Sequence, residues 1–149
     1  MKNTWSKRSL ERRAQLCPEL QRLVDAVLAK HDCSIIQAYR GREDQAAAFA
    51  AGNSKATFGK SAHNYLPAYA VDLYPWPLPH KTMPSGALGI DWDAPAWDEL
   101  VVVIKETAAE LGIDIVSGAD WSTLVDKPHT ELANWRELIK REDAQNGKN

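Results

Sequence analysis

The clearest pattern of apolar and polar positions lies in residues 18–30. Pro18 opens this segment, and proline is well tolerated in the first turn of a helix. Apolar side chains then recur at helical spacing on one face, at Leu20, Leu23, Val24, Val27 and Leu28. The pattern predicts an amphipathic helix that buries this face. The preceding residues 6–16 are polar and also favour a helix.

A second amphipathic helix is predicted to begin after Asp93, a plausible N-cap, and to end at Gly112. One of its faces is apolar: Trp97, Leu100, Val101, Ile104, Ala108 and Leu111. Two shorter helices are expected. Arg42 to Ala51 is rich in alanine and is closed by Gly52, and Asn134 to Glu142 forms the closing helix.

Strands are predicted at residues 34–39, 70–74, 113–116 and near 129–132. Residues 53–69 are expected to be a polar loop, and residues 75–95, with five prolines, an irregular surface loop. The last four residues are expected to be a loose tail. Because strands and helices do not alternate regularly, the pattern favours an α+β fold. We find no internal repeat and expect a single domain over residues 1–149, with its core at about 18–143.

Composition and charge limit the classes of function that the chain could have. The chain has 149 residues, of which 44% are apolar and 26% charged, as in an ordinary globular domain. A net charge of -2 gives no overall attraction to nucleic acid. No apolar run approaches the roughly 20 residues of a membrane span, and the N-terminus lacks the apolar stretch of a signal peptide. We therefore expect a protein made in the cytoplasm, and Cys17 and Cys33 are interpreted as buried or bystander thiols.

Two of the four histidines, His63 and His129, lie near Asp72 and Asp126 in the sequence. A catalytic zinc ion takes about three protein ligands, usually histidine and carboxylate, and keeps a position for water. A further carboxylate can then take the proton of that water. Two histidines and two carboxylates would suffice for such a site. By spacing alone, however, loop histidines and strand-end aspartates are more often ordinary surface residues. The HExxH motif of helical zinc proteases is absent.

The order of several motifs is more informative than any one of them. They are Ser61-Ala62-His63, Ala70-Val71-Asp72 and Asp126-Lys127-Pro128-His129, preceded by Tyr39-Arg40, Gln45 and Gly52-Asn53-Ser54. In this order the chain resembles, from about Leu20 to Trp135, the zinc peptidase family that includes bacterial D-Ala-D-Ala carboxypeptidases and the L-alanyl-D-glutamate peptidases of phage endolysins (peptidase family M15). The resemblance implies a Hedgehog/DD-peptidase-like fold, in which helices pack on a small, mostly antiparallel sheet.

The resemblance also implies roles for individual residues. One zinc ion would be held by His63, Asp72 and His129, with Asp126 as general base and then acid. Arg40 would hold or polarise a substrate carbonyl or carboxylate, and Ser61 and Gln45 would be supporting contacts near the substrate. Structural alternatives stay open: Arg40 could only pair with Glu43 or Asp44, Ser61 could be a turn residue, Gln45 could only pack, and Trp121 is expected to pack beneath the site.

One departure concerns the spacing of the first two ligands. Eight residues separate His63 from Asp72, whereas the family has six, and Leu66-Pro67-Ala68 replaces an expected glycine. We expect a loop bulge that leaves both ligands in place. His31 and His80 are not expected to bind metal, and residues 75–95 are expected to rim the cleft.

The resemblance therefore predicts a phage-type endolysin that cuts the L-Ala–D-Glu bond of the peptidoglycan stem peptide. The alternatives are a D-Ala-D-Ala carboxypeptidase, a catalytically silent, metal-containing module that binds cell wall, and a zinc-free interaction domain. We expect a monomer with no nucleic-acid partner and no membrane insertion. It would act on the cell wall or periplasm after release from the host cytoplasm.

Overall fold

The centre of the molecule is a four-stranded antiparallel sheet in the order β1-β2-β6-β5. The computed structural model describes residues 2–146. The strands of this sheet are β1 (Cys33–Gln37), β2 (Ala70–Pro75), β5 (Ile115–Ser117) and β6 (His129–Leu132). Every pairing joins strands that are distant in the sequence or separated by a helix, and the sheet with its helices confirms the α+β class.

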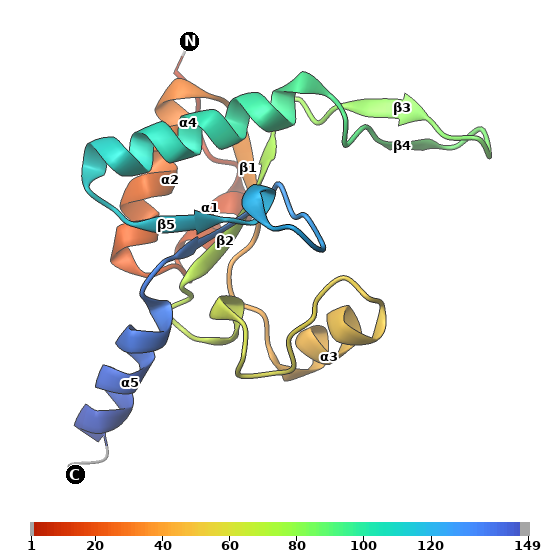
Figure 1. The fold of residues 1–149 in the computed structure, drawn as a ribbon. Helices are drawn as coiled ribbons and strands as arrows, with labels where there is room; N and C mark the ends of the chain where they lie inside the picture. Colours follow the sequence, from red (N-terminus) through yellow and green to blue (C-terminus); the bar gives the residue numbers. More distant parts are fainter. Residues whose placement is uncertain (1, 147–149) are drawn as a thin grey trace.

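Two helices form the hydrophobic core with this sheet, α2 (Pro18–Lys30) and α4 (Pro95–Leu111), whereas α1 (Lys7–Arg13) buries only Ser9. Helix α2 packs against α4, α1 packs on β1, and α4 contacts β2 and β5 (Figure 1). All five apolar positions predicted for α2 are buried. Leu16 and Cys17 are buried as well, so the core also includes residues before Pro18.

Helices α3 (Arg42–Ala50) and α5 (Trp135–Asn146) lie away from the α2–α4 pair (Figure 1). Helix α3 buries a single side chain, Gln45, which explains why its apolar pattern is weak. As predicted, Gly52 follows α3 in the left-handed conformation, at φ 77°. Helix α5 begins one residue after Asn134 and includes Asn146, and the rest of the expected loose tail lies outside the described residues.

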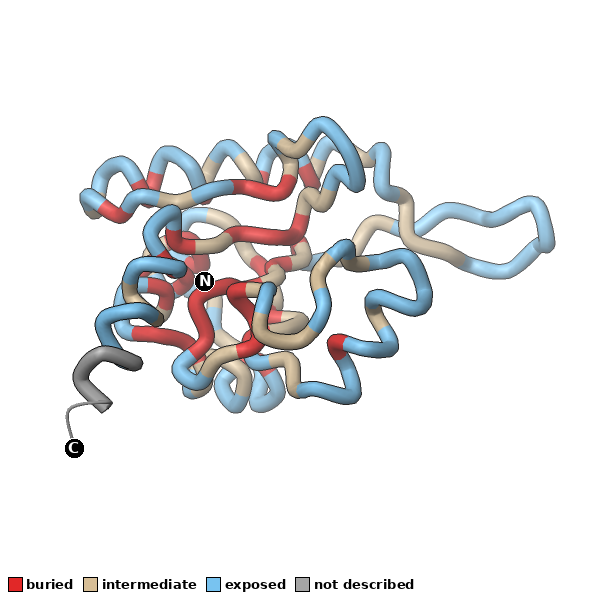
Figure 2. Tube along the Cα trace, turned by 60° about the horizontal axis from the view of Figure 1, so that its bottom comes forward, coloured by how far each residue is buried: buried red, intermediate tan, exposed pale blue. Residues whose placement is uncertain are grey.

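The prediction of an irregular loop at residues 75–95 was wrong for its central part. Strands β3 (His80–Thr82) and β4 (Leu88–Ile90) pair there as a hairpin, which extends from the body and is mostly exposed (Figures 1 and 2). Each strand has three residues, and neither alternates between buried and exposed positions. The hairpin therefore leaves no period-2 signal in the sequence.

Several helices and strands begin at residues other than those predicted, and local backbone hydrogen bonds accompany these differences. The N-cap position of α4 is Ala94, without a side-chain cap, and Asp93 instead lies in the preceding turn, where its amide donates to Asp91. Strand β5 begins at Ile115, since the Ile113 amide still donates to Ala108 and closes the helix. The polar loop 53–69 contains a 3-10 turn, η1 (Ala62–Asn64), and a second one, η2 (Gly118–Asp120), follows β5.

Strand β1 ends at Gln37, earlier than predicted, because the chain leaves the sheet there. The Tyr39 amide donates to the side chain of Gln15, and the Arg40 amide donates to the carbonyl of His63. This departure brings Arg40 beside η1. Within residues 2–146, no helix combines the length and apolar character needed to cross a bilayer.

Candidate metal centre and active site

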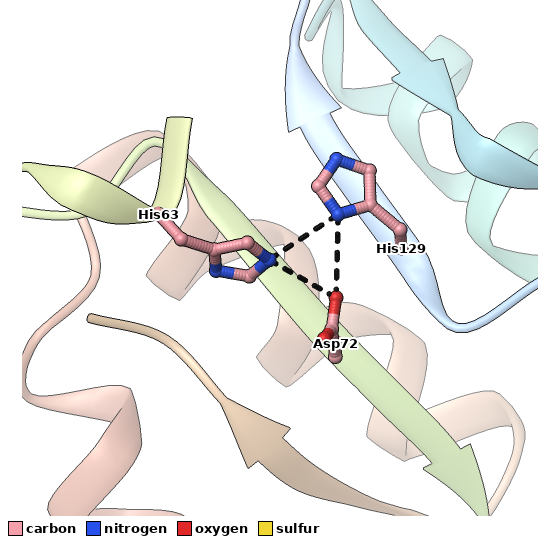
Figure 3. Close-up of side chains that lie close together, drawn as sticks. All are labelled: His63, Asp72 and His129. Atoms are coloured by element: carbon pink, nitrogen blue, oxygen red, sulfur yellow. Dashed lines mark hydrogen bonds and ion pairs between the residues drawn. The ribbon is translucent and has the colours of Figure 1, made fainter. Parts of the chain in front are cut away.

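Three side chains from separate segments converge at one end of the sheet: His63, Asp72 and His129 (Figure 3). Asp72 on β2 is the direct partner of His129 on β6, so both side chains project from the same face. His63 comes from η1. The distances are 3.2 Å from His63 Nε2 to Asp72 Oδ1, 3.2 Å from His63 Nε2 to His129 Nδ1 and 3.3 Å from His129 Nδ1 to Asp72 Oδ1.

These separations suit a single metal ion. Ligand atoms about 2.0–2.1 Å from a tetrahedral zinc ion lie about 3.3 Å from one another. The second nitrogen of each ring fixes which nitrogen faces the centre. His63 Nδ1 donates to the carbonyl of Ala38 at 2.7 Å, and His129 Nε2 donates to Glu131 Oε1 at 2.7 Å. When the rings are neutral, they therefore present lone pairs at His63 Nε2 and His129 Nδ1, which face the carboxylate of Asp72.

Local hydrogen bonds hold His63 in place. Ser61 accepts from the His63 amide and forms a capping box with Asn64 around η1. The His63 carbonyl accepts from Arg40, and the Ala62 carbonyl accepts from Tyr69. His63 is only 1% exposed, so the ring has little freedom to move.

The longer spacing between His63 and Asp72 is absorbed away from the centre. The extra residues Leu66 and Pro67 are exposed, whereas Ala68 is buried. The Ala68 amide donates to Gln15, and the Ala68 carbonyl accepts from Cys17. The bulge therefore packs against the segment between α1 and α2, and the two candidate ligands still meet at 3.2 Å.

The charges of the three groups are strongly coupled. Burial would raise the pKa of Asp72, but His63 and His129 outweigh it and hold that pKa well below its usual range. Burial would lower the pKa of His129, but Asp72 and Glu131 outweigh it and raise that pKa to about 9. Because a metal binds the neutral ring, protons and cations compete for this site.

Asp126 lies beside the triad at the start of the turn that leads into His129. Its amide donates to the Gly118 carbonyl at 2.9 Å, and its own carbonyl accepts from the His129 amide at 3.1 Å. Burial raises the pKa of Asp126, and the nearby Asp72 carboxylate raises it further, against the opposing charges of His129, His63 and Arg40. Such a carboxylate is a better proton acceptor than an exposed one.

Arg40 is anchored by two glutamines rather than by the acidic residues of α3. Its guanidinium donates to Gln37 Oε1 and, at 3.1 Å, to Gln45 Oε1. Gln45 is 0% exposed, and it also accepts from Asn64 and donates to Ser54 and the Ala56 carbonyl. Gln45 therefore lies beneath Arg40, in a buried polar network.

Two cavities adjoin at the triad. The first, of about 360 Å³, is lined by His63, His129, Ser61 and Trp121, and the second, of about 690 Å³, by Asp72 and Tyr74. Arg40 and Asp126 line both. Trp121 packs on the His129 ring with centroids 4.9 Å apart and also faces the first cavity.

The other two histidines lie elsewhere in the fold. His31 caps the end of α2, and His80 is exposed on β3. Neither belongs to the group of His, Cys, Asp and Glu side chains that could hold a metal in the described part of the chain. Cys17 and Cys33 are free and buried, as interpreted from the sequence.

Sequence reasoning missed two residues that support the centre. Glu131 accepts from His129 and, through its other oxygen, from Trp135 Nε1 at 2.7 Å. Its spacing of two from His129 on a strand was an available signal, because such residues share a face. Gly118 is the second: a Cβ there would lie 2.3 Å from the carbonyl oxygen of Asp126. No local pattern indicates that contact.

A small α+β domain that brings two histidines and a carboxylate together beside a further carboxylate and an arginine has the arrangement of a single-metal hydrolase. The comparisons specify the class. The sequence model of the phage L-alanyl-D-glutamate peptidases matches residues 1–133, and the chain belongs to that family. This confirms the resemblance seen in the motifs.

A solved structure agrees with this assignment. The chain is similar to the L-Ala D-Glu endopeptidase ChiX of Serratia marcescens, with 28% sequence identity and a TM-score of 0.68. The similarity covers 90% of this chain and 92% of that one. A search of curated proteins gives no significant match. The chain is thus a peptidoglycan-cleaving peptidase of the endolysin type.

Proposed function

We propose that this chain is a zinc-dependent endopeptidase that cuts the L-Ala–D-Glu bond of the peptidoglycan stem peptide. One observation carries the zinc dependence: two ring nitrogens with fixed lone pairs and a carboxylate oxygen lie 3.2–3.3 Å apart. Without a cation or a proton between them, these three acceptors would repel one another. Family membership supports the choice of bond.

His63, Asp72 and His129 would hold the ion. When bound, zinc lowers the pKa of a coordinated water to about 7 and polarises the carbonyl of the bond to be cut. The two histidines and Asp72 are preorganised for this task, because Ala38, Glu131 and the β2–β6 pairing fix their orientation. Little rearrangement would therefore accompany metal binding.

Asp126 would act as the proton carrier. Its raised pKa and its place in the wall of both cavities support this role. It would take a proton from the attacking water and deliver it to the nitrogen of the leaving D-Glu. Arg40, which stays charged, would stabilise negative charge on the reacting carbonyl or hold a substrate carboxylate. Ser61, in the wall of the first cavity, would contact substrate, and Gln45 would support Arg40 from below.

The cell wall is the place of action that the family implies. We propose that the protein is made in the host cytoplasm, remains monomeric and reaches the wall after release. Its partner would be the stem peptide.

The test is digestion of purified peptidoglycan by the zinc-loaded protein, a chelated sample and the Asp126→Asn variant, with mass analysis of the new ends. We expect new N-terminal D-Glu from the loaded protein alone. Release of D-Ala would select the carboxypeptidase, and no cleavage by a folded, zinc-bound sample would select the silent binding module.

Metal content provides a second test that does not depend on activity. The His63→Ala variant should lose the bound zinc, whereas the matched His80→Ala variant should retain it. Equal zinc content in both variants would contradict the assignment of the ligands.

A further inference from the structure

The two cavities beside the triad differ in their charge. The first cavity carries four basic side chains: Arg40, Lys55, Lys60 and Arg136. Two acidic residues also line it, Asp126 and Glu131, and the Glu131 carboxylate is already occupied by His129 and Trp135. The second cavity has one basic side chain, Arg40, and three carboxylates, Asp44, Asp72 and Asp126.

The basic side chains of the first cavity are partly held in position. Lys55 Nζ donates to Thr123 at 2.7 Å, which ties residues 53–56 to the loop that precedes Asp126. The guanidinium of Arg136 lies over the ring of Trp135, 4.4 Å from its centroid. Both side chains still belong to exposed residues, so a ligand carboxylate can reach them.

Tyr74 and Trp92 are the aromatic side chains that line the second cavity. The Trp92 ring stacks on the buried Trp97 with centroids 4.6 Å apart, and it meets Tyr74 edge-on at 5.8 Å. Trp92 is nevertheless 44% exposed. A fixed, partly exposed indole of this kind suits the apolar face of a sugar ring.

The two sides of the L-Ala–D-Glu bond also differ in charge. On the C-terminal side, D-Glu continues through its γ-carboxyl and keeps a free α-carboxylate, and diaminopimelate adds another. On the N-terminal side, L-Ala is joined to the lactyl group of a muramyl sugar and has no free carboxylate.

We propose that the cleft is directional: the basic cavity binds the D-Glu–diaminopimelate side of the cut bond, and the acidic cavity, which contains the exposed Trp92, binds the muramyl–L-Ala side. This proposal rests on the proposed function. The triad lies at the junction, since His63 and His129 line the first cavity and Asp72 lines the second. The reverse orientation would bring the substrate carboxylates against Asp44, Asp72 and Asp126.

The first experiment compares two muramyl peptides that differ only in the D-Glu α-carboxylate, which is free in one and amidated in the other. The zinc-loaded protein should cut the free acid with a several-fold higher kcat/KM. In the double variant Lys55→Gln/Lys60→Gln this preference should disappear through a rise in KM, with kcat nearly unchanged. Lys55→Arg should retain the preference, and so should the matched control Lys81→Gln on the hairpin.

The second experiment compares the peptide with and without its muramyl sugar. Trp92→Ala should lower kcat/KM several-fold for the sugar-bearing substrate alone, whereas Trp76→Ala, exposed outside both cavities, should not. If Trp92→Ala lowered kcat/KM equally for the substrates with and without the sugar, the proposed orientation would be contradicted. So would an unchanged acid preference in the lysine double variant.

Binding of the two product halves separates this proposal from the proposed function. By calorimetry, the γ-D-Glu–diaminopimelate dipeptide should lose affinity in the lysine double variant, and muramyl-L-Ala should lose affinity in Trp92→Ala. If both halves bind in this way but no substrate is cut, the proposed function fails and the directional cleft stands. If neither substitution changes the affinity of its half, the directional cleft is wrong.

Discussion

Asp72 on β2 and His129 on β6 are direct partners across an antiparallel pair, with Asp72 Oδ1 and His129 Nδ1 3.3 Å apart. On the other side of β2, Asp72 is also the partner of Gln37, which holds Arg40. One row of side chains across three strands therefore orients two candidate metal ligands and the arginine. The sheet register, rather than any single loop, sets this part of the centre.

The first prediction concerns Glu131. Glu131→Gln should weaken zinc affinity about 10–100-fold, because His129 loses a charged acceptor that fixes its ring. Competition with a coloured chelator measures this affinity independently of activity. Glu137→Gln, an exposed change on α5, serves as the control and should leave the affinity unchanged. Equal affinities of wild type and Glu131→Gln would show that β6 alone orients His129.

The second prediction concerns the contact between η2 and the turn before β6. Gly118→Ala should destabilise the fold by about 1–3 kcal/mol, since the new Cβ would lie 2.3 Å from the Asp126 carbonyl oxygen and 3.0 Å from His129 Cβ. Denaturant unfolding measures the stability, and kcat should fall as Asp126 shifts. Gly41→Ala is the control, because its Cβ would meet Tyr39 at 3.7 Å, an ordinary contact. Equal unfolding midpoints would contradict the close packing.

The third prediction concerns the support of Arg40. Gln45→Leu should cost about 1–3 kcal/mol for each buried partner left unsatisfied among Ser54, Ala56 and Asn64. It should also lower kcat/KM, because Arg40 loses one of its two acceptors. Thermal unfolding and wall digestion measure the two effects. Glu43→Gln should change neither, and an equal loss of activity there would instead indicate that Arg40 pairs with Glu43.

The fourth prediction concerns stability in acid. Asp25 accepts hydrogen bonds from Arg13 and Trp5, and the bond from Arg13 is the main reason its pKa lies below the usual 3.8. The folded state thus binds this proton more weakly than the unfolded state. The resulting stabilisation is present above pH 3.8 and is lost as the pH falls through the lower, folded pKa.

Asp25→Asn should therefore lower the free energy of unfolding at pH 7 by less than about 1 kcal/mol, since the pair is partly exposed to solvent. The difference from wild type should begin to decline as the pH falls below 3.8 and should vanish below the lower, folded pKa. Urea unfolding at several pH values measures it. Glu99→Gln, an exposed change on α4, should show no such dependence, and a difference for Asp25→Asn that persists in strong acid would contradict the assigned cause.

The sequence by itself determined the features that depend on local patterns. Helical spacing in α2 predicted every apolar side chain that the helix buries, and motif order identified the family. The same motif order selected His63, Asp72 and His129, although spacing alone left them indistinguishable from surface residues. These signals are readable because a helix face and a motif are contained within a few consecutive residues.

Tertiary structure decided what depends on contacts between distant segments. Two of these contacts join residues far apart in the sequence: the pairing of Asp72 with His129, and the hydrogen bond from His63 to Ala38. A third is the close approach of Gly118 to the backbone of Asp126. The β3–β4 hairpin was missed because its exposed strands have no buried face to impose an alternating pattern. The separation of a basic cavity from an acidic one likewise arises only when residues 40–60, 72–92 and 121–136 are folded around one centre.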